Sequence, residues 1–192
     1  SMALSALPPA RIINSQESLS HMLADLKKQT SIAVDTESNS LHAYQEKVCL
    51  IQISTPKTDY LLDPLALQDL SPLGEVFADP SIQKVFHAGD YDLATLKRDF
   101  GFEFANVFDT MLAATALAEP SIGLAALLEK YFGLVIEKKY QRANWGKRPL
   151  DPEMLVYAQG DSRYLLQLRD LLVEKLTEVN RLENVLEDSA AL

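Results

Sequence analysis

Cysteine is almost absent from this chain of 192 residues, in which Cys49 is the single example. One cysteine excludes an internal disulfide and a cysteine-based zinc cluster. The longest apolar runs are far too short to cross a membrane, and the first residues lack the order of a secretory signal, so we expect a cytoplasmic protein without membrane association. Internal repeats are also missing. We therefore predict one domain over residues 1–192, with residues 1–2 a cloning remnant and residues 186–192 a frayed end or the start of a linker.

Positive charge is scarce as well, with 18 lysines and arginines against 27 acidic residues and a net charge of −9. This balance argues against nonspecific nucleic-acid binding, because polyphosphate partners select basic surfaces. One segment, from Lys138 to Arg148, is instead rich in positive charge. The segment contains no acidic residue and interleaves its positive charges with Tyr140 and Trp145. Such a pattern either holds phosphate groups or is a solvated loop.

Hydrophobic periodicity predicts strands early in the chain and helices later. The predicted strands are 31–38, 47–54, 58–63 and 82–89, followed by a short buried segment at 106–110. The predicted helices are 15–28, 72–77, 90–100, one that starts at 109, 122–131 and 152–182. The first three strands are consecutive, which favours an antiparallel meander. This order predicts an α/β fold with a mixed sheet flanked by helices.

The stretch VDTESNSL places Asp35 and Glu37 two residues apart at the end of a predicted strand. Residues two apart in a strand point to the same face, so the two carboxylates project together. Burial would raise their pKa values unless a cation neutralises them, and a divalent ion with oxygen ligands is the usual solution. The alternative is a pair of exposed surface acids.

The stretch HAGDYDL lies at a predicted strand-to-helix junction. Asp90 occupies the position of a helix N-cap. Asp92 follows within the first helical turn, where its side chain can face the end of the sheet. His87 is a metal ligand, a substrate contact or a core histidine, and the absence of a second histidine at ligand spacing argues against the first role.

The stretch YAQGDSRYLL lies on a predicted helix. Tyr157 and Asp161 are four residues apart and share a face, and Leu165 and Leu168 direct that face inward. Taken alone, the pair is typical of a buried tyrosine bonded to an aspartate. Three separate junctions that each deliver inward acids are harder to explain by packing, because unpaired buried carboxylates are strongly disfavoured. Their convergence predicts a two-metal centre and phosphodiester hydrolysis.

Together, DTE, HAGDYDL and YAQGD resemble the three motifs of the DEDD superfamily of 3′-5′ exonucleases, in its tyrosine-marked branch, and most closely ribonuclease D. The resemblance extends from about Ile32 to Leu171. It implies the ribonuclease H-like, or DnaQ-like, exonuclease fold and release of nucleoside 5′-monophosphates from the 3′ end of single-stranded RNA. A DNA exonuclease of proofreading or repair type is one alternative, because DTESNSL also resembles the first motif of proofreading domains. A non-catalytic nucleic-acid-binding module that keeps the fold is another.

The resemblance also assigns roles to the acids and the tyrosine. It implies two ions, Mg²⁺ or Mn²⁺, both bridged by Asp35. Glu37 and Asp161 would complete the site that holds the attacking water, and Asp92, five residues after the histidine, would serve the second ion. Tyr157 would orient that water or help to deprotonate it.

Substrate contacts follow from the same resemblance. His87 resembles a residue near the terminal sugar, and Leu41 resembles the apolar residue that packs on the terminal base. Within KKYQRANWGKRPL, the residues expected to face the nucleic acid are Lys138, Lys139, Gln141, Arg142 and Arg148. Trp145 either stacks on a base or anchors the loop to the core. Asp109 is interpreted as a helix cap or a group behind the site.

Overall fold

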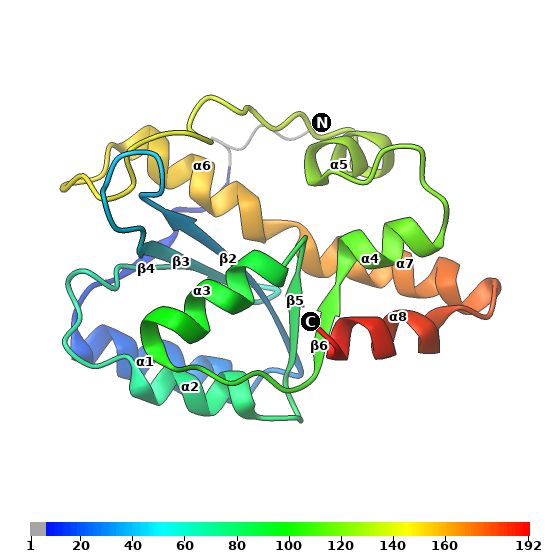
Figure 1. Cartoon of the computed structure of the whole chain (residues 1–192), viewed down its shortest axis with the longest axis horizontal. Helices are drawn as coiled ribbons and strands as arrows, with labels where there is room; N and C mark the ends of the chain where they lie inside the picture. The colour runs from blue at the N-terminus through cyan, green and yellow to red at the C-terminus, as the bar shows by residue number, and fades with distance from the viewer. Residues whose placement is uncertain (1–6) are drawn as a thin grey trace.

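The computed structural model describes residues 7–192 as one mixed sheet with helices on both faces, which confirms the predicted α/β class (Figure 1). The strands are β1 (Arg11–Ile13), β2 (Ser31–Ser38), β3 (Val48–Ser54), β4 (Asp59–Leu62), β5 (Gln83–Phe86) and β6 (Val107–Asp109). The helices are α1 (Gln16–Leu26), α2 (Ser71–Ala78), α3 (Asp90–Phe100), α4 (Thr110–Ala116), α5 (Leu124–Phe132), α6 (Pro152–Arg163), α7 (Leu165–Glu178) and α8 (Leu182–Ala190). In this described range, no helix is both long and apolar enough to pass through a bilayer. Residues 1–2 lie outside it.

The sheet has the strand order β1-β4-β3-β2-β5-β6. β2, β3 and β4 form the predicted antiparallel meander, and β5 and β6 extend the sheet from the other side of β2 as parallel strands. β2 is therefore an interior strand, buried from Ser31 to Val34 and partly exposed from Asp35 onward. A register shift between Glu37 and Ser38 disturbs its pairing with β3. Asp35 and Glu37 therefore lie where β2 leaves the buried core.

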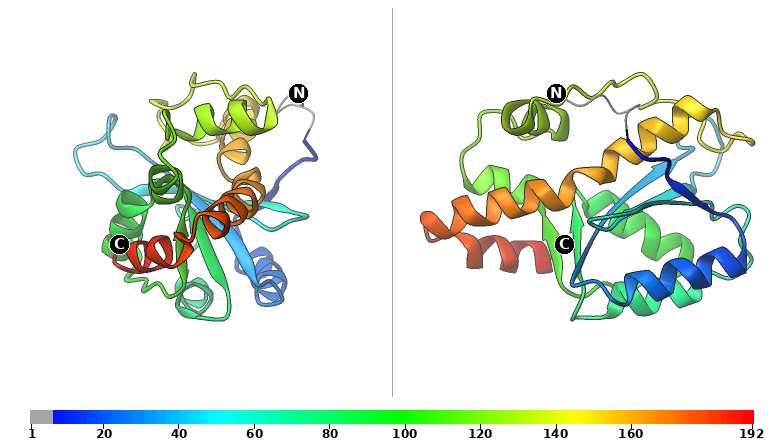
Figure 2. Two further views of the ribbon diagram at one scale, coloured as in Figure 1. Left: turned by 90° about the vertical axis from the view of Figure 1, so that its right-hand side faces the viewer. Right: turned by 180° about the vertical axis from the view of Figure 1, so that it is seen from behind.

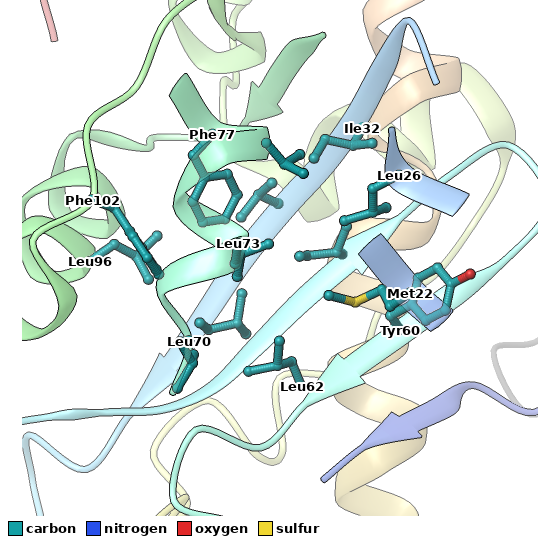
Figure 3. Close-up of a cluster of buried hydrophobic side chains, with 14 of the residues drawn as sticks. Met22, Leu26, Ile32, Tyr60, Leu62, Leu70, Leu73, Phe77, Leu96 and Phe102 are labelled. Carbon is teal, nitrogen blue, oxygen red and sulfur yellow. The ribbon is translucent and has the colours of Figure 1, made fainter. Parts of the chain in front are cut away.

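Two hydrophobic layers hold the sheet in place. On one face, Met22 and Leu26 of α1 pack with Leu73 and Phe77 of α2 over Ile32 of β2 (Figure 3). Burying each of these side chains stabilises the fold by roughly 1.5–3 kcal/mol. On the other face, α6 crosses β2, β3 and β4, and α7 continues over β2 and β5 (Figure 2). The second layer matters for function, because α6 carries the third sequence motif.

Three local features differ from the sequence expectations. β1 was not predicted, because it has three residues, of which only Ile13 is buried, and pairs with β4 at the sheet edge. The continuous helix predicted over 152–182 is wrong, since Tyr164, with ψ of 0°, separates α6 from α7. A frayed end or linker was expected over 186–192, but α8 continues to Ala190. Val185 and Ser189 of this helix are buried, the latter accepting a hydrogen bond from the backbone of β6.

Candidate functional site

Three of the predicted acids meet at the end of β2. Asp35 and Glu37 leave the strand on one face, and Asp161 faces them from α6. Each of the three residues offers one carboxylate oxygen, and these oxygens all lie within 4.8 Å of one another. The spacing of two in a strand and the inward face of the helix therefore produce the predicted convergence. The alternative prediction, that Asp35 and Glu37 are exposed surface acids, is wrong, because both side chains are only partly exposed and face a third acid.

Asp92 lies beside this group, in the first turn of α3, and is buried. Its Oδ1 accepts a hydrogen bond from the hydroxyl of Thr36, the residue between the two acids of β2. Burial, and next the charge of Asp92 itself, raise the pKa of Asp35 well above its usual value. Asp92 is therefore close enough to act on the cluster, although it is outside the tight group of three oxygens.

The electrostatics of the four acids are those of uncompensated anions. Burial, followed by the charges of Asp35 and Asp161, raises the pKa of Glu37 well above its usual value. Burial also raises the pKa of Asp161 to about 6, and that of Asp92 to about 7. Among residues 7–192, no lysine or arginine forms an ion pair with any of the four. Oxygen-only donors with unbalanced negative charge fit a divalent cation such as Mg²⁺ or Mn²⁺.

Tyr157 reaches the cluster from one turn before Asp161 on α6. Its ring stacks on Trp145, with centroids 6.0 Å apart, and forms a T-shaped pair with the ring of Tyr140, with centroids 5.9 Å apart. Burial and the neighbouring carboxylates raise the pKa of its hydroxyl far above the usual value. Trp145 is 1% exposed, so it anchors its loop to the core, and stacking on a base is excluded in this conformation.

Arg148 was expected to face a nucleic-acid strand, but its guanidinium is bound by groups of this chain. Its guanidinium binds Asp63 through two hydrogen bonds of 2.9 and 3.0 Å and donates to the carbonyl oxygens of Cys49 and Trp145. A guanidinium with these partners holds the loop against β3 and has little left for a phosphate. Lys139 lies 3.6 Å from Glu153, in an exposed ion pair that a phosphate could replace at small cost.

Two cavities flank the acids. The larger, of about 260 Å³, is lined by Asp35, Thr36, Glu37, His87, Leu124, Gln141, Tyr157, Asp161 and Leu165. The smaller, of about 150 Å³, is lined by Thr36, Glu37, Ser38, Ser40, Leu41, Tyr91, Asp92, Gln141, Arg142 and Ala143. Four predicted substrate residues, Leu41, His87, Gln141 and Arg142, therefore lie at the site. Gln141 borders both cavities, whereas Lys138 borders neither. Sequence reasoning missed Tyr91 and Leu124, because only the folded chain shows what lines a cavity.

Asp109 holds the junction that presents Asp92. It caps α4, as expected, with hydrogen bonds from the backbone of Met111 and Leu112, and it also accepts from Ala88 at 3.1 Å and from Gly89 at 2.7 Å. The predicted N-cap role of Asp90 is wrong, because α3 is capped by Gly89 without any side-chain bond. The buried Asp109 carboxylate accepts from the backbone just before α3, at Ala88 and Gly89. Nearby, the hydroxyl of Thr110 bonds Nδ1 of His87 at 2.8 Å.

The sequence of this chain is similar to that of known proteins. A family model described as 3′-5′ exonuclease matches residues 10–177. Exosome complex exonuclease RRP6 of Saccharomyces cerevisiae is 44% identical over 178 residues, which are 92% of this chain and 24% of that protein. The chain thus spans about a quarter of the length of this relative.

Solved structures agree with the observed fold. The catalytic core of RRP6 from Trypanosoma brucei superposes with a TM-score of 0.93 and 36% identity, over 99% of this chain and 53% of that one. Escherichia coli RNase D, an exoribonuclease involved in structured RNA processing, gives 0.88 and 30%, over 94% and 48%. Brucella melitensis NrnC, solved with bound Mg²⁺, gives 0.79 and 25%, over 93% and 87%. The predicted ribonuclease H-like exonuclease fold is confirmed.

Proposed function

Because the chain belongs to the 3′-5′ exonuclease family, we propose that it shortens single-stranded RNA from the 3′ end and releases nucleoside 5′-monophosphates. The observation that carries the proposal is the meeting of three carboxylates from β2 and α6 within 4.8 Å. RNA is favoured over DNA because RNase D is an exoribonuclease and the RRP6 relative is an exosome exonuclease. The cytoplasmic location and the single domain stay predictions.

We assign the metal-binding role to the four acids. Asp35, Glu37 and Asp161 would hold one divalent cation, and Asp35 with Asp92 would hold a second. The raised pKa values support this, because buried carboxylates without cationic partners gain most from a bound cation. When bound, the ions would stabilise the charge that develops on the attacking and leaving oxygens of the phosphodiester.

Tyr157 is proposed to orient the attacking water. Its hydroxyl keeps its proton, because burial and three nearby carboxylates raise its pKa far above neutral pH. A protonated phenol can donate one hydrogen bond and accept others, which suits it to hold a water molecule in line. The stack on Trp145 fixes the ring that carries this hydroxyl. Of the two roles that the resemblance allowed, orientation is therefore favoured over deprotonation.

The two cavities suggest how a strand would lie across the acids. They share Thr36, Glu37 and Gln141, so the two spaces adjoin at these residues beside the acids. We propose that nucleotides on the two sides of the scissile bond occupy them, with Gln141 at the division. Leu41 and Arg142 would contact the strand in the smaller cavity and His87 in the larger.

Stepwise digestion tests the proposal. We expect 5′-end-labelled single-stranded RNA to give a ladder that shortens from the 3′ end with Mg²⁺ or Mn²⁺, and EDTA to stop it. A circular RNA of the same sequence should stay intact, because it has no 3′ end. A ladder on matched DNA alone would support the DNA alternative, whereas RNA binding without any product would support the non-catalytic module.

A further inference from the structure

Gln52 is a polar side chain in the middle of an otherwise largely apolar strand. It lies in β3, is 0% exposed and pairs in register with Asp35 of β2. Its Nε2 donates to Oε1 of Glu37 at 3.4 Å. Its Oε1 is buried and has no hydrogen-bond partner among residues 7–192. The amide thus contacts the acid cluster through Glu37, and it lines neither of the two cavities.

Packing alone does not account for this amide. A buried polar atom without a partner costs stability, and a leucine or methionine would fill the same space without that cost. Among residues 7–192, the bond to Glu37 is the one contact of the Gln52 side chain that requires an N–H group. The chemistry of that group matters, because an amide donates to a carboxylate without bringing a positive charge. A lysine or arginine at this position would neutralise Glu37 and compete with a cation.

We propose that Gln52 is a positioning residue for the metal site, which orients the Glu37 carboxylate toward Asp35 and Asp161 and leaves its charge free for a cation. The inference rests on the proposed function, since it concerns the same four acids. A carboxylate that ligates a metal is itself held by hydrogen bonds, and removal of such a partner typically weakens metal affinity by roughly 10–100-fold. Gln52 is the side chain that donates this bond to Glu37.

Two substitutions without a donor test the role. In Gln52→Met the length of the side chain is kept, and Gln52→Leu provides a second apolar form should the first pack poorly. Ile53→Val is the matched control, because Ile53 is the next residue of β3, belongs to the core on the opposite face and does not approach the acids. Mn²⁺ affinity is measured by calorimetric titration of each protein, and the unfolding midpoint is measured separately in EDTA.

We expect both Gln52 variants to bind Mn²⁺ roughly tenfold or more weakly than the unsubstituted protein. Ile53→Val should lower the unfolding midpoint and leave the Mn²⁺ affinity unchanged. Gln52 variants that bind Mn²⁺ as tightly as the unsubstituted protein would overturn the positioning role alone. An unsubstituted protein that binds no Mn²⁺ would instead overturn the metal site itself, so the two failures are distinguishable.

Discussion

Replacing Asp161 with asparagine should stabilise the metal-free protein while it abolishes cleavage. Asparagine keeps the shape and an oxygen that can accept a hydrogen bond from Glu37, but it removes one negative charge from the cluster. Burial raises the pKa of Asp161 from 3.8 to about 6. The folded state therefore binds this proton more tightly than the unfolded state, and ionisation at neutral pH costs the fold free energy.

The size and the pH dependence of the effect follow from that pKa. A difference of about 2 pKa units corresponds to about 3 kcal/mol, an upper limit because Asp161 keeps some contact with solvent. The penalty accumulates as the pH rises from 3.8 to about 6 and is complete above that value. Asp161→Asn should thus gain up to about 3 kcal/mol at pH 7.5 but only about 1 kcal/mol at pH 4.5.

Urea denaturation followed by circular dichroism in EDTA, at both pH values, measures the gain. Asp170→Asn is the control, because the Asp170 side chain is 71% exposed on α7 and its loss should change little. Mn²⁺ should reverse the order, since the unsubstituted site binds the ion and the variant does so weakly. A variant that is less stable than the unsubstituted protein in EDTA at pH 7.5 would refute the reasoning, because Asp161 would then be a satisfied structural acid.

Three further predictions concern the surroundings of the cluster. Tyr157→Phe should lower the single-turnover cleavage rate by about 10²-fold without changing Mn²⁺ affinity, and an unchanged rate would remove the hydroxyl from the reaction. Arg148→Ala should lower the free energy of unfolding by about 2 kcal/mol in urea, because Asp63 loses a charged partner, while the salt dependence of RNA binding should stay as before. Asp109→Ala should cost roughly 2 kcal/mol by the same assay, since it removes a helix cap and two further N–H acceptors, and an intact midpoint would contradict this account.

The acid cluster could be predicted because local geometry settles most of it. Period two in a strand sends Asp35 and Glu37 to one face, and a spacing of four in a helix aligns Tyr157 with Asp161, whatever the rest of the fold. Burial then follows from the surrounding apolar pattern. Gln52, by contrast, stands out in the sequence only as a polar residue in an apolar run, and its contact with Glu37 could not be predicted because it depends on how β3 pairs with β2. That register is a tertiary property, fixed by the meander as a whole.

The basic segment, residues 138–148, shows what composition alone does not predict. A guanidinium forms the same forked hydrogen bonds with a carboxylate of its own chain as with a phosphate, so composition cannot distinguish the two partners. Arg148 was expected to face nucleic acid, yet Asp63, 85 positions earlier, binds it. Arg142 of the same segment lines the smaller cavity and is exposed. The loop therefore has a structural part and a part at the site. Arg148 and Trp145 fix the loop against the core, and Trp145 also stacks on Tyr157 of α6. Arg142 is thereby held at the smaller cavity.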